Sequence, residues 1–193
     1  MGYRIDWKSD VGQLVAYEPT LEEVAQHADV LARGYNEPRN AELMGHTEHI
    51  GPEEVVELFE ESAEEGVRSF LLFRDGNFVG DGDLRGIHDG TAEFAFMIGA
   101  PTEQGKGLGT RFAQMIHVFG FTDLKLTAIY ASIAPANSAS RRVFDKLGYI
   151  LDEGDAYARS YADEPDDIVM MISREMFQRA NAEAIAKIRL ALR

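Results

Sequence analysis

The chain has 193 residues, of which 45% are hydrophobic and 27% charged, so it can bury the core of one folded domain. Its 33 acidic residues outnumber its 19 basic residues, and the resulting net charge of −14 argues against a protein that binds nucleic acid by neutralising phosphates. The absence of cysteine from the sequence excludes disulfide frameworks, thiolate zinc sites and a cysteine nucleophile.

The first half of the chain predicts helices followed by an antiparallel set of strands. The T-x-x-E capping box at Thr20 and Glu23 marks the start of one helix, and Gly34 is expected to end it. Asp75-Gly76 is a strong hairpin signal, because a type I′ turn needs positive φ at both central residues. In chain order, we expect a strand at 11–17, a helix at 20–34, a polar irregular segment at 35–50, a helix at 52–66 and strands at 68–74, 77–87 and 91–98.

The second half predicts helices alternating with strands. Asn137 and Gly148 are good cap residues for the two ends of a short helix. In chain order, we expect a glycine-rich loop at 104–109, a helix to 120, a strand at 124–133, a helix at 137–148, strands at 149–152 and 168–173, and a helical tail at 174–193. The fold class is therefore α/β in the broad sense. We expect a mixed, mostly antiparallel sheet of about six to seven strands with helices on both faces, and one parallel pair flanking the helix after the loop.

The sharpest local feature is the glycine-rich segment from Gln104 to Thr110, which lies between a strand and a helix. A helix N-terminus has backbone N–H groups without partners and a partial positive charge. Glycines allow the chain to turn tightly and let a phosphate approach the backbone. The segment therefore predicts an anion site, most simply for a diphosphate, to which Lys106 and Arg111 add local positive charge.

Three other interpretations of this loop compete with an anion site. A Walker P-loop is rejected because no Gly-Lys-Ser/Thr sequence occurs. A dinucleotide-binding G-x-G-x-x-G fingerprint is disfavoured, since Thr110 stands at its third glycine position and antiparallel strands precede it. A glycine-rich turn that binds nothing stays open on this motif alone.

A second motif, one strand later, strengthens the interpretation. Q-x-x-G-x-G at Gln104, Gly107 and Gly109 resembles the acyl-CoA signature of the GCN5-related N-acetyltransferases (GNAT). The segment from Asn137 to Tyr149, NSASRRVFDKLGY, is similar to that family's N-x-x-[AS]…K-L-G-[FY] segment. The resemblance covers roughly residues 11–173, and its pattern is most similar to spermidine acetyltransferases and ribosomal-protein N-terminal acetyltransferases.

The resemblance implies a single acyl-CoA N-acyltransferase domain over 1–193, with a core at about 11–173. It implies acetyl-CoA as co-substrate and direct transfer of the acetyl group to a primary amine: a polyamine, another small amine or a peptide N-terminus. The residues that it assigns to the cofactor are Ile98, Gly99, Gln104, Gly105, Lys106, Gly107, Leu108, Gly109, Thr110, Arg111 and Asn137. One extra residue around Gly99, relative to the family pattern, suggests a β-bulge there.

The resemblance also suggests the catalytic groups. Glu93 is the expected base, acting through water on the attacking ammonium. Many relatives have a tyrosine as general acid where this chain has Phe144, so Ser140, one helical turn earlier, is the expected acid. Tyr130 and Tyr149 are weaker candidates, and protonation of the thiolate by water is a further route.

The remaining features set limits on partners. His46 and His49 lack a clear third ligand, so no metal site is expected. No apolar run approaches the ~20 residues of a membrane span, and the first residues lack the core of a secretory signal, so a cytoplasmic protein without membrane or nucleic-acid partners is expected. A homo-oligomer is compatible with the sequence. Two other functions stay open: a catalytically weak acyl-CoA-binding sensor, because of Phe144, and a nucleotide- or dinucleotide-binding module.

Overall fold

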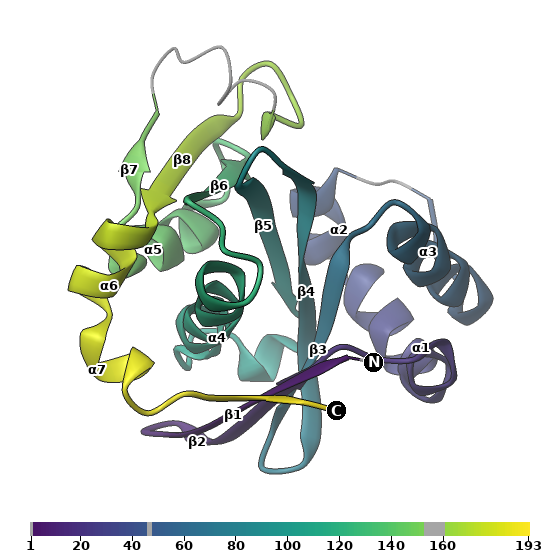
Figure 1. Ribbon diagram of the computed structural model, residues 1–193. Coiled ribbons are helices and arrows are strands. Elements are labelled where there is room, and N and C mark those ends of the chain that lie inside the picture. The colour runs from purple at the N-terminus through teal and green to yellow at the C-terminus, as the bar shows by residue number, and fades with distance from the viewer. Residues whose placement is uncertain (1, 46–47, 153–160) are drawn as a thin grey trace.

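The computed structural model describes residues 2–45, 48–152 and 161–193, and these form a twisted sheet covered by helices on both faces (Figure 1). The strands are β1 (Tyr3–Ser9), β2 (Gly12–Tyr17), β3 (Arg68–Arg74), β4 (Asn77–His88), β5 (Thr91–Ile98), β6 (Ala128–Ile133), β7 (Ile150–Leu151), β8 (Ile168–Ser173) and β9 (Arg189–Leu192). The helices are α1 (Leu21–Tyr35), α2 (Pro38–Met44), α3 (Pro52–Glu64), α4 (Leu108–Thr122), α5 (Ser138–Leu147), α6 (Arg174–Ala180) and α7 (Ala182–Ile185), with a 3-10 turn η1 (Pro101–Glu103).

The sheet is mixed but mostly antiparallel, as predicted. Its strand order is β7-β8-β6-β5-β4-β3-β2-β1-β9, and among the described residues the one parallel pair is β5–β6, on either side of α4. A strand–helix–strand crossover gives this parallel pair, whereas hairpins give the antiparallel ones. A doubly wound parallel sheet, the setting of a dinucleotide fingerprint, is therefore not what this chain forms.

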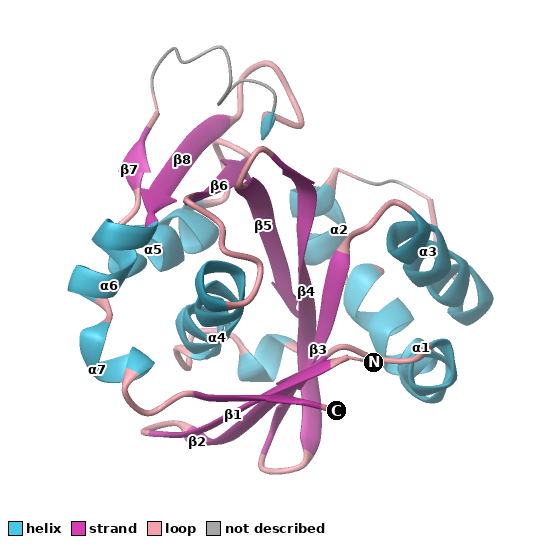
Figure 2. Ribbon diagram, viewed as in Figure 1, coloured by secondary structure: helices cyan, strands magenta, loops and turns pink. Residues whose placement is uncertain are grey.

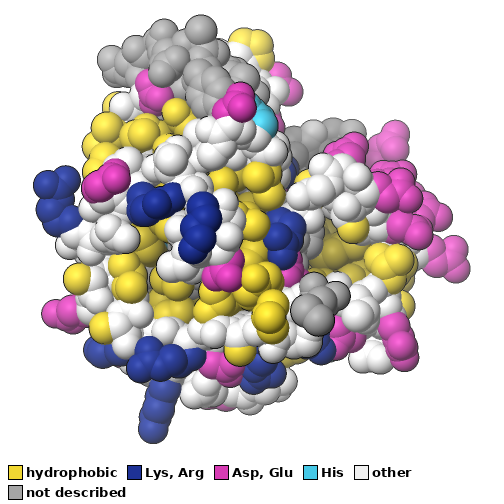
Figure 3. Space-filling view, viewed as in Figure 1, with side chains coloured by type: hydrophobic (Ala, Val, Ile, Leu, Met, Phe, Trp, Pro, Cys, Tyr) yellow, Lys and Arg dark blue, Asp and Glu magenta, His cyan; other side chains and the backbone are white. Residues whose placement is uncertain are grey.

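Helices lie on both faces of the sheet (Figure 2), and two apolar cores hold them there. On one face, α4 is buried on nearly all sides, and Phe112 and Phe119 pack against Phe94 and Phe70 from the strands. On the other face, α1 and α3 pack on Leu71 and Met97. The outer side of α3 is acidic and lies in solvent (Figure 3).

Local signals explain most helix ends. Thr20 and Glu23 form the predicted capping box of α1. Asn137 caps α5 by accepting a hydrogen bond from the Ser140 N–H at 3.0 Å, and Gly148 ends that helix with φ +94°. Glycine adopts positive φ more readily than any other residue, which accounts for its presence at this C-cap.

Four predicted elements are wrong in detail. Gly34 does not end α1 but lies within it, where an added Cβ would stand 2.9 Å from the Met97 methyl carbon and 3.2 Å from the Gly99 Cα. Residues 35–50, expected to be irregular, contain α2, which has Pro38 at its start and Gly45 in the left-handed region after its end. The strand expected at 124–133 begins at Ala128.

The fourth correction concerns the chain's last residues. The tail expected to be helical over 174–193 is helical only in α6 and α7, and its last strand, β9, pairs antiparallel with β1. β1 was also missed, so the sheet has nine strands among the described residues rather than six to seven. Pairing between residues far apart in sequence overrides the weak helix preference of this segment.

Candidate active site and cofactor cleft

Two neighbouring strands diverge in the middle of the sheet. β5 and β6 pair only where Thr91–Glu93 meet Ala128–Tyr130. Beyond that point β5 continues to Ile98 along β4, and β6 continues to Ile133 along β8. Residues from both strands, from the glycine loop and from α5 line a cleft of ≈ 970 Å³ at this opening.

The free edge of β5 offers backbone groups to the cleft. The Gly99 N–H donates to the Val79 carbonyl on β4 at 3.1 Å. Because successive backbone groups alternate between the two edges of a strand, the Ile98 and Phe96 groups face the opening instead. The Ile98 carbonyl accepts a hydrogen bond from the Gln104 side chain at 2.9 Å, so its N–H is the better placed donor for a ligand in the cleft.

The bulge expected at Gly99 is not there. The β4–β5 pairing keeps one register from Arg85–Glu93 through Gly80–Ile98, and the Gly99–Val79 hydrogen bond continues it. The irregularity lies on the neighbouring strand, where the β3–β4 register shifts and leaves Val79 without a paired residue on β3. The extra residue therefore lies in β4, beside Gly99. A sequence alone does not show which of two neighbouring strands carries a bulge.

The glycine loop leads directly into α4, as predicted. Gly105 and Gly107 have φ of +74° and +81°, and Gly107 is the N-cap of the helix, without a side-chain capping bond. Gly109 is needed for packing, since an added Cβ would stand 2.8 Å from the Phe96 ring. The buried Leu108 and Thr110 fix this first turn in place. The backbone N–H groups at its start lack intrahelical partners and lie at the rim of the cleft.

Side-chain amides fasten this loop to the end of β5. Gln104 donates to the Asn40 Oδ1 at 3.2 Å as well as to the Ile98 carbonyl. Asn40, which is buried, donates in turn to the Gly34 and Gly99 carbonyls at 2.8 and 3.2 Å. Gln104 therefore holds the loop to β5 and α2, and Asn40 is a supporting residue that sequence reasoning missed because it lay in a segment taken as irregular.

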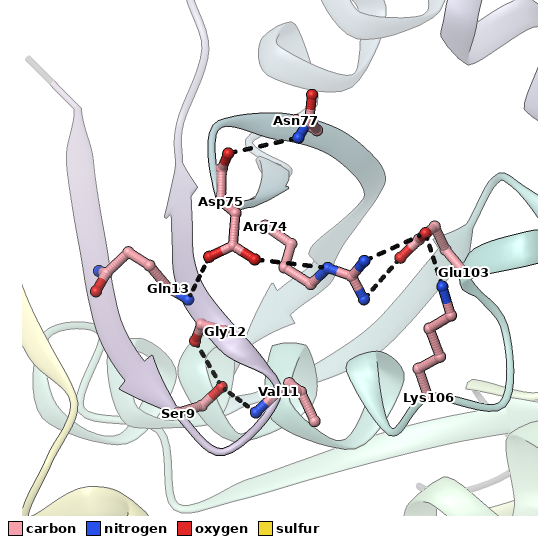
Figure 4. A network of polar contacts seen from close by, with 9 residues as sticks. All are labelled: Ser9, Val11, Gly12, Gln13, Arg74, Asp75, Asn77, Glu103 and Lys106. Carbon is pink, nitrogen blue, oxygen red and sulfur yellow. Dashed lines mark hydrogen bonds and ion pairs between the residues drawn. The ribbon is translucent and has the colours of Figure 1, made fainter.

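The cations near the loop are paired with carboxylates. Glu103 accepts a hydrogen bond from Lys106 at 3.0 Å and forms an ion pair with Arg74 at 2.9 Å, and Arg74 also forms an ion pair with Asp75 (Figure 4). Arg111 forms a two-point ion pair with Asp10 in the β1–β2 turn. The three cations around the loop are thus matched by three carboxylates, those of Glu103, Asp75 and Asp10.

Glu93 lies where β5 and β6 separate, and its side chain is only 5% exposed. Burial raises the pKa of Glu93 to about 7, since the charged carboxylate loses its hydration there. The cross-strand neighbour Arg85 opposes this rise in pKa, while the nearby Asp163 and Asp83 add to it. Arg85 itself is held by Asp83 through two contacts of 2.7 Å.

The helix that follows β6 supplies the remaining predicted residues. Asn137, Ser140 and Phe144 all line the cleft, with Phe144 in contact with the apolar core. The hydroxyl of Tyr149 points elsewhere, because it donates to the Nε2 of the buried His117, whose Nδ1–H donates to the Ala113 carbonyl. Tyr149 is therefore a poor acid candidate, and Ser140 stays the predicted one.

Several polar residues of the cleft were not predicted. Tyr35, Asp81, Asp83 and Arg85 line it together with Glu93. The charged residues alternate along β4, and three ionisable side chains on one face of a strand are a signal that could have found them.

The described residues hold no group of three or more side chains suited to a metal, and none of their helices is long and apolar enough to cross a membrane. His46 lies outside the described residues, so the predicted absence of a metal at His46 and His49 stays a prediction.

Part of the chain is similar in sequence to a curated acetyltransferase. Spermidine N(1)-acetyltransferase of Escherichia coli (strain K12) is 34% identical over 87 residues, 44% of this chain and 46% of that protein, so the chain spans about half the length of the curated relatives it matches.

Solved structures share the fold over most of their length. RimJ of Mycobacterium smegmatis, in complex with CoA-disulfide, has a TM-score of 0.75 at 16% identity over 96% of both chains. The aminoglycoside acetyltransferase AAC(6')-Ib, in complex with coenzyme A, has a TM-score of 0.71 at 20% identity over 87% of this chain and 99% of that one. Ribosomal-protein-S5-alanine acetyltransferase from Vibrio fischeri has a TM-score of 0.69 at 17% identity over 89% and 98%. The model of the acetyltransferase (GNAT) domain matches residues 19–150, and the chain therefore belongs to the GNAT family.

Proposed function

We propose that this protein transfers an acetyl group from acetyl-CoA to a primary amine, with both substrates bound at once. The observation that carries the proposal is the divergence of β5 from β6 at Glu93, which opens a cleft with an uncapped helix N-terminus at its rim. Family membership supports the choice of co-substrate, as do two structural neighbours that were solved in complex with CoA-disulfide and coenzyme A.

The cleft fits a long anionic carrier. The backbone N–H groups of residues 105–110 are available to a diphosphate, since Gly105 and Gly107 expose the backbone and α4 adds its dipole. Further in, the β5 edge at Phe96 and Ile98 can pair with an amide-bearing arm as an added strand would. Asn137, at the opposite wall, can contact the same arm. When bound, acetyl-CoA supplies an activated thioester.

Glu93 is the proposed general base. A carboxyl group with a pKa of about 7 is partly ionised at neutral pH and is a far better proton acceptor than an ordinary glutamate. It would take a proton from the acceptor ammonium, directly or through one water, and so expose the nitrogen lone pair for attack. The Ile98 N–H, about 17 Å from Glu93 along β5, is proposed to pair with the arm, and the Phe96 N–H, on the same edge and nearer to Glu93, is proposed to donate to the thioester oxygen as negative charge develops there.

Ser140 is the proposed proton donor to the departing thiolate. It lies in the first turn of α5 and lines the cleft, one helical turn before Phe144. Phe144 has no hydroxyl, and that of Tyr149 is engaged with His117. Because Phe144 removes the tyrosine that many relatives have, a catalytically weak acyl-CoA sensor stays the second candidate.

The acceptor is proposed to be a small amine, a polyamine or a peptide N-terminus. The net charge of −14 and the carboxylates in the cleft favour a cationic molecule. Proteins similar to this chain include a spermidine acetyltransferase and an aminoglycoside acetyltransferase, whose acceptors are amines of this kind.

The proposal is tested by incubating the protein with acetyl-CoA and a panel of amines while measuring release of free thiol, with acetyl-CoA binding measured in parallel by calorimetry. Glu93→Gln should lower kcat by about a hundredfold or more and leave CoA affinity within about twofold. Tight acetyl-CoA binding without transfer to any amine would favour the sensor. Glu93 would lose its role if the variant kept the wild-type rate across the pH range.

A further inference from the structure

Tyr35 and Asp81 form a polar pair in the cleft that the proposed acetyl transfer does not use. Tyr35 is the last residue of α1, Asp81 lies on β4, and both line the cleft. The Tyr35 hydroxyl donates to Asp81 Oδ2 at 2.7 Å. The other carboxylate oxygen, Oδ1, is buried and accepts no hydrogen bond from the described residues.

A buried carboxylate with an unsatisfied oxygen is unfavourable unless a donor or a cation meets it. Burial raises the pKa of Asp81 to about 7, in accord with this. The cation four residues along the strand, Arg85, is already held by Asp83 through two contacts of 2.7 Å. A ligand that brings a positively charged N–H group would satisfy both the oxygen and the charge of Asp81.

Asp81 and Glu93 lie on the same face of the β4–β5 hairpin. Asp81 lies opposite Met97 of β5, and Met97 is four residues further along that strand than Glu93. The two carboxylates are therefore offset by four residues along β5. At the rise of an antiparallel strand this offset is about 14 Å along β5. A single extended molecule in the cleft can therefore approach both carboxylates.

We propose that Asp81, oriented by Tyr35, binds a second ammonium group of the acceptor while the first is presented to the base. The inference rests on the proposed acetyl transfer and narrows its substrate to amines with two separated positive charges. Asp81 is the specificity-determining residue, since its carboxylate attracts the second ammonium group and has no comparable partner in a monoamine. Tyr35 is a positioning residue, because it holds Oδ2 by a hydrogen bond and leaves Oδ1 without a donor among the described residues.

The test compares kcat/KM for a series of α,ω-diamines with that for monoamines of equal chain length. The wild-type protein should prefer the diamine, and one chain length should be best because the spacing of the two carboxylates is fixed. In Asp81→Asn the ratio of diamine to monoamine kcat/KM should fall about tenfold to hundredfold, mainly through the diamine KM. Asparagine has the same shape and still accepts from Tyr35, so CoA affinity should be retained. Tyr35→Phe keeps the negative charge of Asp81, so it should lower the diamine to monoamine ratio less than Asp81→Asn does.

Two results would overturn the inference while leaving acetyl transfer intact: a wild-type protein that acetylates both amines equally well, or an Asp81→Asn variant with an unchanged ratio. If no amine is acetylated, the proposed acetyl transfer is itself wrong. The cation site at Asp81 is then tested by measuring diamine binding. Calorimetry of the diamine with the CoA-loaded wild type and with Asp81→Asn should show weaker binding to the variant. Equal binding would refute a cation site at Asp81.

Discussion

At the scale of single residues, the site depends on carboxyl groups that are kept away from water. Glu93 and Asp81 lie in the same cleft, and burial raises the pKa of each to about 7. Surface carboxylates titrate some units lower and are weak bases at neutral pH. Burial in the sheet thus gives these two carboxyl groups pKa values near neutral pH. The charged form of each is less well solvated there, which lowers the stability of the folded state.

Replacing Glu93 by Gln should change the pH dependence of stability. Because the pKa of Glu93 in the folded state lies above the ordinary value of 4.5, its stabilising contribution is fully present below about pH 4.5 and is lost as pH rises toward about 7. Glutamine does not ionise. The difference in Tm between Glu93→Gln and wild type should therefore shift in favour of the variant from pH 4.5 to 7 and then level off. Thermal unfolding across this range measures it, and a difference that stays constant with pH would contradict the buried state of Glu93.

Asn137 has two proposed roles that can be separated. Its Oδ1 caps α5 by accepting from the Ser140 N–H, and its amide group is proposed to contact the pantetheine arm. Asn137→Ala should lose about 1 kcal/mol, or about 2–4 °C in Tm, together with CoA affinity. Asn137→Ser restores a cap, so it should recover the Tm. If it also recovers the CoA affinity, Asn137 acts through the helix alone.

At the scale of elements, local signals predicted most of the architecture. The capping box at Thr20, the Asp75-Gly76 turn and the cap residues of α5 lie within a few residues of what they control, and the structure has all three. The strand, the glycine loop and α4 follow in the predicted order for the same reason. Elements set by distant pairing were missed, since nothing local marks β9 as the partner of β1.

The residues of the candidate site also fall into those that local motifs predict and those that only tertiary packing brings together. The glycine loop, Glu93 and the α5 residues could be placed because each belongs to a contiguous motif. Asp81 and Tyr35 meet from positions 46 residues apart, and the Gln104–Asn40 contact spans 64 residues. Such meetings depend on how α1 and α2 dock on the sheet, which periodicity within a segment does not reveal.

At the scale of the whole molecule, the two ends of the chain lie together on one side of the sheet (Figure 1). β9 covers the outer edge of β1, the Arg193 guanidinium stands 4.2 Å from the Tyr17 ring centroid, and Arg193 pairs with Glu23 of α1. An edge strand left open invites pairing with other chains. β9, a strand of four residues, thus replaces the seven-residue β1 as the edge of the sheet, at a distance from the cleft.

Deleting residues 189–193 should lower stability by about 2 kcal/mol, or about 4–8 °C in Tm, and should promote aggregation. Arg193→Ala keeps the strand and loses only the ion pair and the ring contact, so its Tm should fall less. CoA affinity of the folded protein should stay unchanged in both, because neither change reaches the cleft-lining residues. A truncated protein with wild-type Tm would show that β9 contributes nothing to the fold.

The most direct measurement for the account as a whole is a crystal structure of the protein with coenzyme A. The account predicts a diphosphate against the backbone N–H groups of residues 105–110 and an arm that runs along β5 with its thiol near Glu93. Coenzyme A bound elsewhere, or an arm that leaves the opening between β5 and β6 empty, would contradict it.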